Sequence, residues 1–198
     1  MKSQRPQIFV SHYGEQKETI TDLLFPIQYL PFNLYVAIDE RKFGKINELI
    51  KENLKQSEVM IPYITESSVN NIWVNQEIGY AHADDLFILP IFESSSLLSG
   101  FISNTVGVKV YDDEIETMHE VVSYLRNEYE PVSIGQYDWF LEFLCPHCSQ
   151  ENTFPITKTQ DELWVDYQEE NNITRSCVKC GADHSFNPVS LEYENPDE

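Results

Sequence analysis

Apolar residues in the first two thirds of the chain alternate between short continuous runs and stretches with helical spacing. Continuous runs are typical of buried strands, and apolar positions three and four residues apart are typical of helices packed on one side. The expected strands lie at residues 8–10, 34–38, 59–64, 86–92 and 106–111, and the expected helices at 20–27, 46–54, 72–83 and 114–127. Because helices separate the strands, the connections are crossovers and the sheet is parallel. The pattern predicts an α/β fold.

Polar residues follow the first three expected strands. Open parallel sheets bind ligands beyond the carboxyl ends of their strands, so these residues are candidates for a binding site. They are Ser11, His12, Tyr13 and Gly14 after the first strand, residues 39–44 after the second, and residues 65–68 after the third.

Trp73 and Glu77 lie four residues apart on the expected helix 72–83 and therefore share a face. The helix follows the third strand, so this face places a carboxylate beside an aromatic ring near the ligand edge. A Trp at helical spacing more often packs in a core, and a Glu one turn away is more often solvated. The pair gains meaning only from the motifs around it.

These motifs together resemble a prokaryotic TIR (Toll/interleukin-1 receptor) domain over residues 7–127. The matching segments are Ile8-Phe9-Val10-Ser11-His12, Val36-Ala37-Ile38-Asp39 with a loop ending at Gly44, residues 46–54 with Ser57, and Trp73-Val74-Asn75-Gln76-Glu77-Ile78-Gly79-Tyr80-Ala81. The Trp-x-x-x-Glu helix is the most specific of them. The chain departs from the family in having Gln7 where an acidic residue is common and Phe43 where a proline often precedes the loop glycine.

The resemblance implies a flavodoxin-like sheet of five strands and, in the enzymatic branch, cleavage of NAD⁺ at the nicotinamide–ribose bond. Glu77 matches the catalytic glutamate of that branch. One carboxylate suffices, because nicotinamide leaves as a neutral amide and needs no general acid, unlike the leaving oxygen of ordinary glycosides. Glu77 would stabilise the positive charge that develops on the ribose. The family also implies self-association through TIR domains and a role in defence against phage.

The remaining pocket residues each have an alternative interpretation. Trp73 or Tyr13 could form an aromatic wall or pack in the core. Asp39 lies at the strand end that matches the family. Arg41 and Lys42, with Lys45, could meet the pyrophosphate of NAD⁺ near a helix N-terminus, or could belong to a solvated loop. Ser11 and His12 would line the pocket; His12 as a general base is the weaker alternative.

Four cysteines in the last third form two Cys-x-x-Cys pairs, Cys145/Cys148 and Cys177/Cys180, separated by 28 residues. This spacing predicts a closed, structural Zn²⁺ site of the zinc-ribbon type. His147 and His184 are alternative ligands, and a redox role is a further alternative. Residues 154–156 and 163–165 are expected ribbon strands, and Gly181 suits the turn after the second pair. We find no internal repeat.

The charge is unevenly distributed along the 198 residues. The formal net charge is −20, with 18 acids and 10 bases in residues 1–127 and 15 acids and 3 bases in 128–198. Such a balance argues against binding of nucleic acid or an anionic membrane surface. The shift predicts a domain at 1–127, a linker at 128–137 and a zinc-ribbon domain at 138–198. Because the ribbon is strongly acidic, we expect it to recognise a protein partner or to serve self-assembly and not to bind nucleic acid. With no signal-like or membrane-spanning run, we expect a cytoplasmic protein.

The function that these observations favour is an NAD⁺ nucleosidase that produces ADP-ribose, a cyclised isomer or a related signal. A second hypothesis is a catalytically silent TIR docking protein. A third is a nucleoside deoxyribosyltransferase-like protein or a nucleotide-binding α/β protein, which would act on free nucleosides and ignore NAD⁺. Release of nicotinamide that depends on Glu77 discriminates the first hypothesis from the others.

Overall fold

The computed structural model describes residues 5–30, 32–37, 45–127 and 139–194. These residues form two compact units. The sheet unit comprises residues 5–25 and 32–117, and the cysteine unit comprises 26–30 and 118–194. No helix in the described ranges has both the length and the apolar character needed to cross a membrane.

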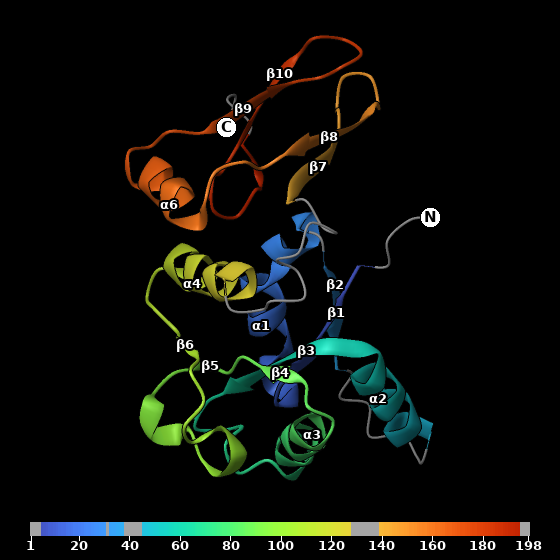
Figure 1. Cartoon of the computed structure of the whole chain (residues 1–198), viewed down its shortest axis with the longest axis vertical. Helices are drawn as coiled ribbons and strands as arrows, with labels where there is room; N and C mark the ends of the chain where they lie inside the picture. The colour runs from blue at the N-terminus through green and yellow to red at the C-terminus, as the bar shows by residue number, and fades with distance from the viewer. Residues whose placement is uncertain (1–4, 31, 38–44, 128–138, 195–198) are drawn as a thin grey trace. The chain divides into compact units, whose positions relative to one another are not determined.

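The sheet unit is built on parallel strands in the order β2-β1-β3-β5-β6, with β4 pairing with β3 (Figure 1). Its strands are β1 Gln7–Ser11, β2 Asn33–Val36, β3 Ser57–Ile64, β4 Phe87–Ile88, β5 Ile91–Phe92 and β6 Val108–Lys109. β4 and β5 are two pieces of one segment. When this segment is counted as the fourth strand and β6 as the fifth, the order along the sheet is 2-1-3-4-5. This is the flavodoxin-like order, and it confirms the predicted fold class.

The predicted strand 86–92 is interrupted in its middle. Leu89 still donates its N–H to the carbonyl of Met60 at 2.9 Å, but Pro90 has no N–H to continue the ladder. The carbonyl of Pro90 instead accepts from the N–H of Val108 at 2.8 Å. Pro62 lies within β3 and pairs with Ser11 without interrupting the strand. A proline removes one hydrogen-bond donor, and the eight-residue strand β3 keeps its pairing on either side of it.

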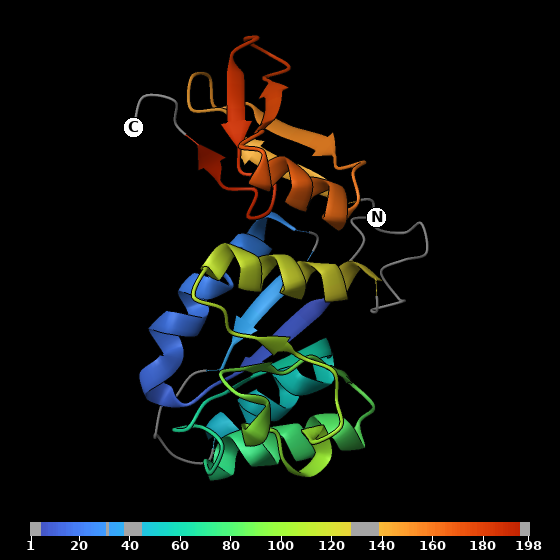
Figure 2. The same cartoon turned by 90° about the vertical axis from the view of Figure 1, so that its left-hand side faces the viewer.

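Helices cover both faces of this sheet, with α2 and α3 on one face and α1 on the other (Figure 2). They are α1 Lys17–Leu23, α2 Lys45–Gln56 and α3 Ile72–Ala83, with short 3-10 turns at Gly14–Gln16, Ser95–Leu97 and Gly100–Ile102. Asn71 caps α3 by accepting the N–H groups of Trp73 and Val74. One buried cluster joins α2 and α3 to the sheet, and it includes Phe9, Leu54, Met60, Val74 and Ile78.

Over the described residues, the cysteine unit contains three antiparallel hairpins and the helices α4 and α6. The helix α4 spans Glu114–Asn127, and its part from Met118 onward belongs to this unit. The other elements are β7 Phe140–Leu144, β8 Glu151–Pro155, α6 Gln160–Gln168, β9 Ile173–Ser176, β10 Asp183–Phe186 and β11 Tyr193–Glu194, with a 3-10 turn at Phe25–Tyr29. β7 pairs with β8, and β10 lies between β9 and β11, all antiparallel.

Residues 163–165 lie in α6, so their prediction as a ribbon strand is wrong. Thr159 and Glu162 form a reciprocal capping box that starts the helix, and Leu163 is its buried apolar contact. Local capping here outweighs the strand preference of a short aromatic and β-branched run. The second predicted ribbon strand, 154–156, largely coincides with the end of β8.

α4 contacts the rest of the cysteine unit through Arg126 and His119. The Arg126 guanidinium donates to the carbonyl of Lys158 at 2.9 Å and to Oε1 of Gln160 at 3.3 Å, and it lies over the ring of Trp139. His119 stacks on Trp164. These contacts explain why α4 groups with this unit from Met118 onward. The predicted linker 128–137 lies outside the described residues, and the predicted domain boundaries stay predictions.

Three turns of the cysteine unit share one backbone conformation. In each turn, the N–H of the fifth residue donates to the carbonyl of the first, and the N–H of the first donates to the carbonyl of the sixth. The turns start at Cys145, Cys177 and Asn187, and their fifth residues Ser149, Gly181 and Leu191 all have positive φ. The backbone therefore repeats where the sequence shows no repeat.

Candidate functional site

Glu77 occupies a position on α3 that helical spacing assigns to the core. The buried residues of the helix are Val74, Glu77, Ile78 and Ala81, which form one stripe against the sheet. A carboxylate in this stripe loses most of its hydration, since only 8% of the residue is exposed. Such a position needs a specific partner or a function.

Ser11 is the hydrogen-bonding partner of Glu77. Its hydroxyl donates to Oε2 of Glu77 at 2.5 Å, and both residues are buried. Burial raises the pKa of Glu77 to about 7, while the bond from Ser11 lowers it. The carboxyl group is thus poised to change charge near neutral pH.

The Ser11–Glu77 pair lies at the switch point of the sheet. Ser11 is the last residue of β1. The helix α3, which carries Glu77, follows β3, and β3 pairs with β1 in the sheet. In the order 2-1-3-4-5, the chain leaves β1 and β3 toward opposite sides, and ligands of such folds bind in the crevice between those two strands. The pair therefore occupies the place where this architecture binds ligands.

Tyr35 on β2 adds a second polar group near Glu77. Burial raises the pKa of Tyr35, and the nearby charge of Glu77 raises it further. Its hydroxyl is inaccessible to solvent and has no hydrogen-bond partner among the described residues, while its ring stacks on Phe9. An unsatisfied buried hydroxyl is costly, so this group is suited to contacting a ligand or an ordered water.

His12 follows Ser11 and is also buried. Its Nδ1 faces the carbonyl oxygen of Tyr13 at 2.9 Å, and its Nε2 faces that of Ala37 at 2.8 Å. With an acceptor at each ring nitrogen, neither nitrogen is directed at a reacting group. The contacts favour a role for His12 in fixing the end of β1 against the residue after β2.

Gln16, Thr65 and Ser68 form a further polar cluster beyond the strand ends. Nε2 of Gln16 donates to Oγ1 of Thr65 at 2.5 Å, and the Ser68 hydroxyl donates to the carbonyl of Tyr63 at 2.8 Å. Oε1 of Gln16 is buried without a partner in the described ranges. The cluster ties the turn after β1 to the loop after β3.

The other predicted pocket residues are not brought together by the described structure. Tyr13 is half-buried at the start of the turn after β1, and Trp73 is 56% exposed near the N-terminus of α3. Asp39, Arg41 and Lys42 lie outside the described residues. Sequence reasoning missed Tyr35 and Gln16, because Tyr35 sits within an apolar run and Gln16 in no motif; no sequence signal marked either of them.

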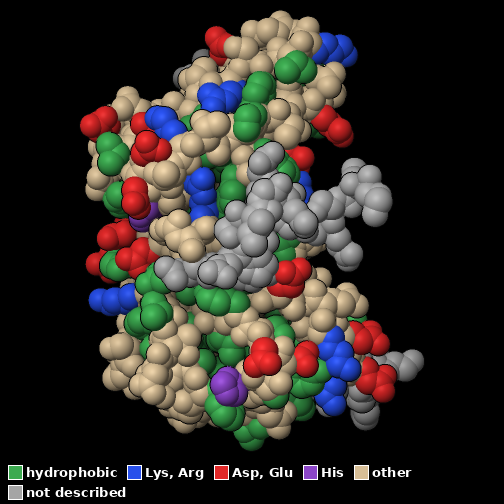
Figure 3. Space-filling model, in the orientation of Figure 1, with side chains coloured by type: hydrophobic (Ala, Val, Ile, Leu, Met, Phe, Trp, Pro, Cys, Tyr) green, Lys and Arg blue, Asp and Glu red, His purple; other side chains and the backbone are tan. Residues whose placement is uncertain are grey.

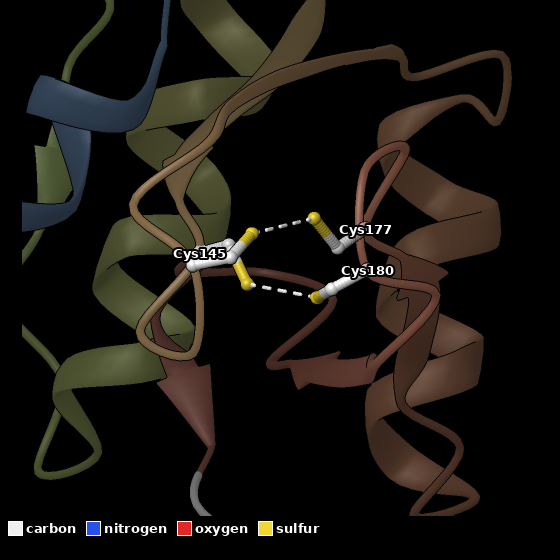
Figure 4. Close-up of side chains that lie close together, drawn as sticks. Cys145, Cys177 and Cys180 are labelled. Atoms are coloured by element: carbon white, nitrogen blue, oxygen red, sulfur yellow. Dashed lines mark hydrogen bonds between the residues drawn. The ribbon is translucent and has the colours of Figure 1, made fainter.

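Four thiols converge in the cysteine unit (Figure 4). The Sγ atoms of Cys145 and Cys180 are 3.7 Å apart, those of Cys148 and Cys177 are 3.6 Å apart, and all four lie within 4.8 Å of one another. A tetrahedral site with metal–sulfur bonds of about 2.3 Å has sulfur–sulfur edges of about 3.8 Å. The four cysteines, all of them free thiols, can therefore hold one metal ion, as the two pairs predicted.

The surroundings of the thiols also suit a cation. Backbone N–H groups of Cys180 and Lys179 lower the pKa of Cys177 to about 6, whereas burial raises that of Cys148 to about 12. The Cys177 thiol therefore ionises more readily than the Cys148 thiol, and a metal ion would have to displace a proton from Cys148 to bind all four sulfurs. Nε2 of His184 lies 3.3 Å from Sγ of Cys145, so this histidine supports a ligand and is not needed as one.

Neither protein-family models nor curated protein sequences match this chain. Among solved structures, a 2-desoxiribosyltransferase from Leishmania mexicana matches with a TM-score of 0.40 and 12% sequence identity. The match covers 45% of this chain and 65% of that protein, so it spans less than two thirds of the relative's length. A likeness of this size carries no information on function.

Proposed function

We propose that this chain cleaves the nicotinamide–ribose bond of NAD⁺, with Glu77 as the catalytic carboxylate. The observation that carries the proposal is the buried Glu77, held by Ser11 at the switch point of a flavodoxin-like sheet. The resemblance of residues 7–127 to TIR domains of the NAD-cleaving branch supports the choice of substrate.

The reaction breaks the bond between ribose C1′ and the pyridinium nitrogen, and the bonding electrons return to the nicotinamide ring. Positive charge then develops on the ribose. An ionised Glu77 stabilises this charge in a poorly hydrated site, where a carboxylate acts more strongly than in water. Ser11 holds the carboxylate in position. Attack by water gives ADP-ribose and a proton, whereas attack by the adenine of the same molecule gives a cyclised isomer.

The four cysteines complete the proposal as a structural Zn²⁺ site. All four ligand positions are thiolates, so no position is left for substrate, and the metal would stabilise the fold of the cysteine unit. The strong negative charge of residues 128–198 supports protein recognition over nucleic-acid binding for this unit.

The test is nicotinamide release from NAD⁺ by the full chain at high protein concentration, with zinc content verified. Glu77→Gln should abolish release while the fold and the zinc content are retained. Glu52→Gln is the matched control, because Glu52 is an exposed acid on α2 and lies outside the candidate site. Absence of release by the wild type under these conditions would contradict the enzyme proposal and favour the docking function.

A further inference from the structure

The four cysteines belong to two hairpins that share no strand pairing. The turn between β7 and β8 carries Cys145 and Cys148. The turn between β9 and β10 carries Cys177 and Cys180. The first hairpin forms a sheet of its own, the second belongs to the sheet β11-β10-β9, and no main-chain hydrogen bond within the described residues joins the two. Side chains must therefore set the position of one cysteine pair relative to the other.

Asn152 of β8 connects the two cysteine turns. Only 3% of this residue is exposed. Its Nδ2 donates to the carbonyl of Gln150 at 2.8 Å, and its Oδ1 accepts the N–H of Val178 at 3.0 Å. The Gln150 carbonyl also accepts the N–H of Cys145 at 2.9 Å. Because Val178 directly follows Cys177, these hydrogen bonds lead from a ligand of one pair to the neighbour of a ligand of the other.

The partners of Asn152 determine how its amide is oriented. A main-chain N–H donates and a carbonyl accepts, so Oδ1 faces Val178 and Nδ2 faces Gln150. A buried amide bonded at both ends is held in one orientation. His184 also reaches from the second hairpin to the first, but its Nε2 lies 3.3 Å from a ligand sulfur, that of Cys145. The effect of Asn152 can therefore be tested without disturbing a contact to sulfur.

The second position of the three similar turns indicates a specific use of the Val178 N–H. The first and third turns have Pro146 and Pro188 at this position, and proline has no N–H. The turn conformation itself therefore needs no donor there. The second turn has a donor at this position, and Asn152 is its acceptor.

We propose that Asn152 is a positioning residue of the metal site, which fixes the second cysteine pair against the first so that the four sulfurs converge. It acts through the main chain of the second turn, since it is bonded to Val178 and not to a sulfur. Residues that orient metal ligands in this way commonly change metal affinity by about 10- to 100-fold. The proposal rests on the metal site of the proposed function and does not involve Glu77.

The experiment titrates Co²⁺ into the full chain, freed of other metal, and records the absorption spectrum and the affinity against a competing chelator. Val178→Pro removes the donated N–H and gives the second turn the residue that the first and third turns have. It should weaken Co²⁺ binding at least about tenfold. Val178→Ala is the matched control, because it keeps the N–H and shortens only an exposed side chain. It should leave the affinity unchanged.

The spectrum at saturating Co²⁺ separates positioning from a general loss of stability. The spectrum of Val178→Pro should differ from that of the wild type, because the thiolates surround the ion in an altered arrangement; a loss of stability alone would leave it unchanged. Asn152→Ala should show the same change. A variant that combines Asn152→Ala with Val178→Pro should bind no more weakly than Asn152→Ala, because the same hydrogen bond is already lost.

Three results would each overturn the role of Asn152. They are an unchanged spectrum at saturation, equal affinities of Val178→Pro and Val178→Ala, and additive losses in the combined variant. Absence of Co²⁺ binding by the wild type would refute the metal site itself, and the role of Asn152 with it.

Discussion

Replacing Glu77 by glutamine should abolish activity and, above neutral pH, increase stability. The folded state raises the pKa of Glu77 from an ordinary 4.5 to about 7, so it holds this proton more tightly than the unfolded chain does. The resulting stabilisation is complete below pH 4.5 and is lost as the pH rises through 7. The difference between these two pKa values corresponds to about 3 kcal/mol of unfolding free energy, which is an upper limit for the cost of the buried, ionised Glu77 at pH 8.

Glutamine keeps the shape of the side chain and an oxygen that accepts from Ser11, but it carries no charge. The free energy of unfolding of Glu77→Gln should therefore match that of the wild type near pH 5 and exceed it by about 1–3 kcal/mol at pH 8. Hydrogen exchange detected by mass spectrometry measures this difference in peptides from β1 and β3, separately from the cysteine unit.

Glu52→Gln, which removes an exposed carboxylate of α2, is the control for this measurement and should not reproduce the increase expected at pH 8. If Glu77→Gln differed from the wild type by the same amount at every pH, the carboxyl group would not ionise in the folded state with a raised pKa. The inference that burial makes the ionised form of Glu77 costly to the folded state would then be wrong.

Four further outcomes follow from the structure. Ser11→Ala removes the bond that lowers the pKa of Glu77, so the rise of kcat/KM with pH should move to higher pH, measured as nicotinamide release. Tyr35→Phe should leave the unfolding free energy in urea unchanged or slightly higher, because the hydroxyl is unsatisfied, while KM increases. Removal of the metal by a chelator should unfold the cysteine unit and leave exchange in β1 and β3 unchanged. Gly107→Ala should cost about 2–4 kcal/mol in the same urea titration, because its Cβ would lie 2.4 Å from the carbonyl oxygen of Pro90.

The sheet unit could be predicted from the sequence because its strands and helices differ clearly in apolar spacing. Helices 72–83 and 114–127 have the predicted bounds, since apolar stripes and polar flanks define both ends. The strand predicted at 86–92 is interrupted in its middle, because Pro90 lacks the N–H that would continue the ladder inside an otherwise continuous apolar run. Residues 163–165 were predicted as a strand although Thr159 and Glu162, a capping box readable in the sequence, indicate a helix.

Glu77 is singled out in the sequence by its match to the Trp-x-x-x-Glu helix of TIR domains, and its catalytic role stays a prediction. Its burial and its bond to Ser11 could not be predicted, because they depend on how α3 packs on β1. Tyr35 could not be found, because a tyrosine in an apolar strand is usually a core residue and only the fold reveals that its hydroxyl lacks a partner. The thiol cluster needed no fold at all, since two Cys-x-x-Cys pairs already specify four converging ligands.

Acidic side chains are spread over the face of the molecule shown in Figure 3, in keeping with the net charge of −20.

The third turn of the cysteine unit needs no metal. In the first two turns, cysteine sulfurs stand at the first and fourth positions, whereas the third has Asn187 and Ser190 there. Oδ1 of Asn187 accepts the N–H groups of Val189 and Ser190 at 2.9 and 3.0 Å. An amide oxygen thus supplies in this turn the acceptor that a thiolate can supply in the others. The turn at Asn187 is therefore closed by hydrogen bonds within the chain, whereas closing the two cysteine turns around an ion would make that part of the unit depend on the supply of metal.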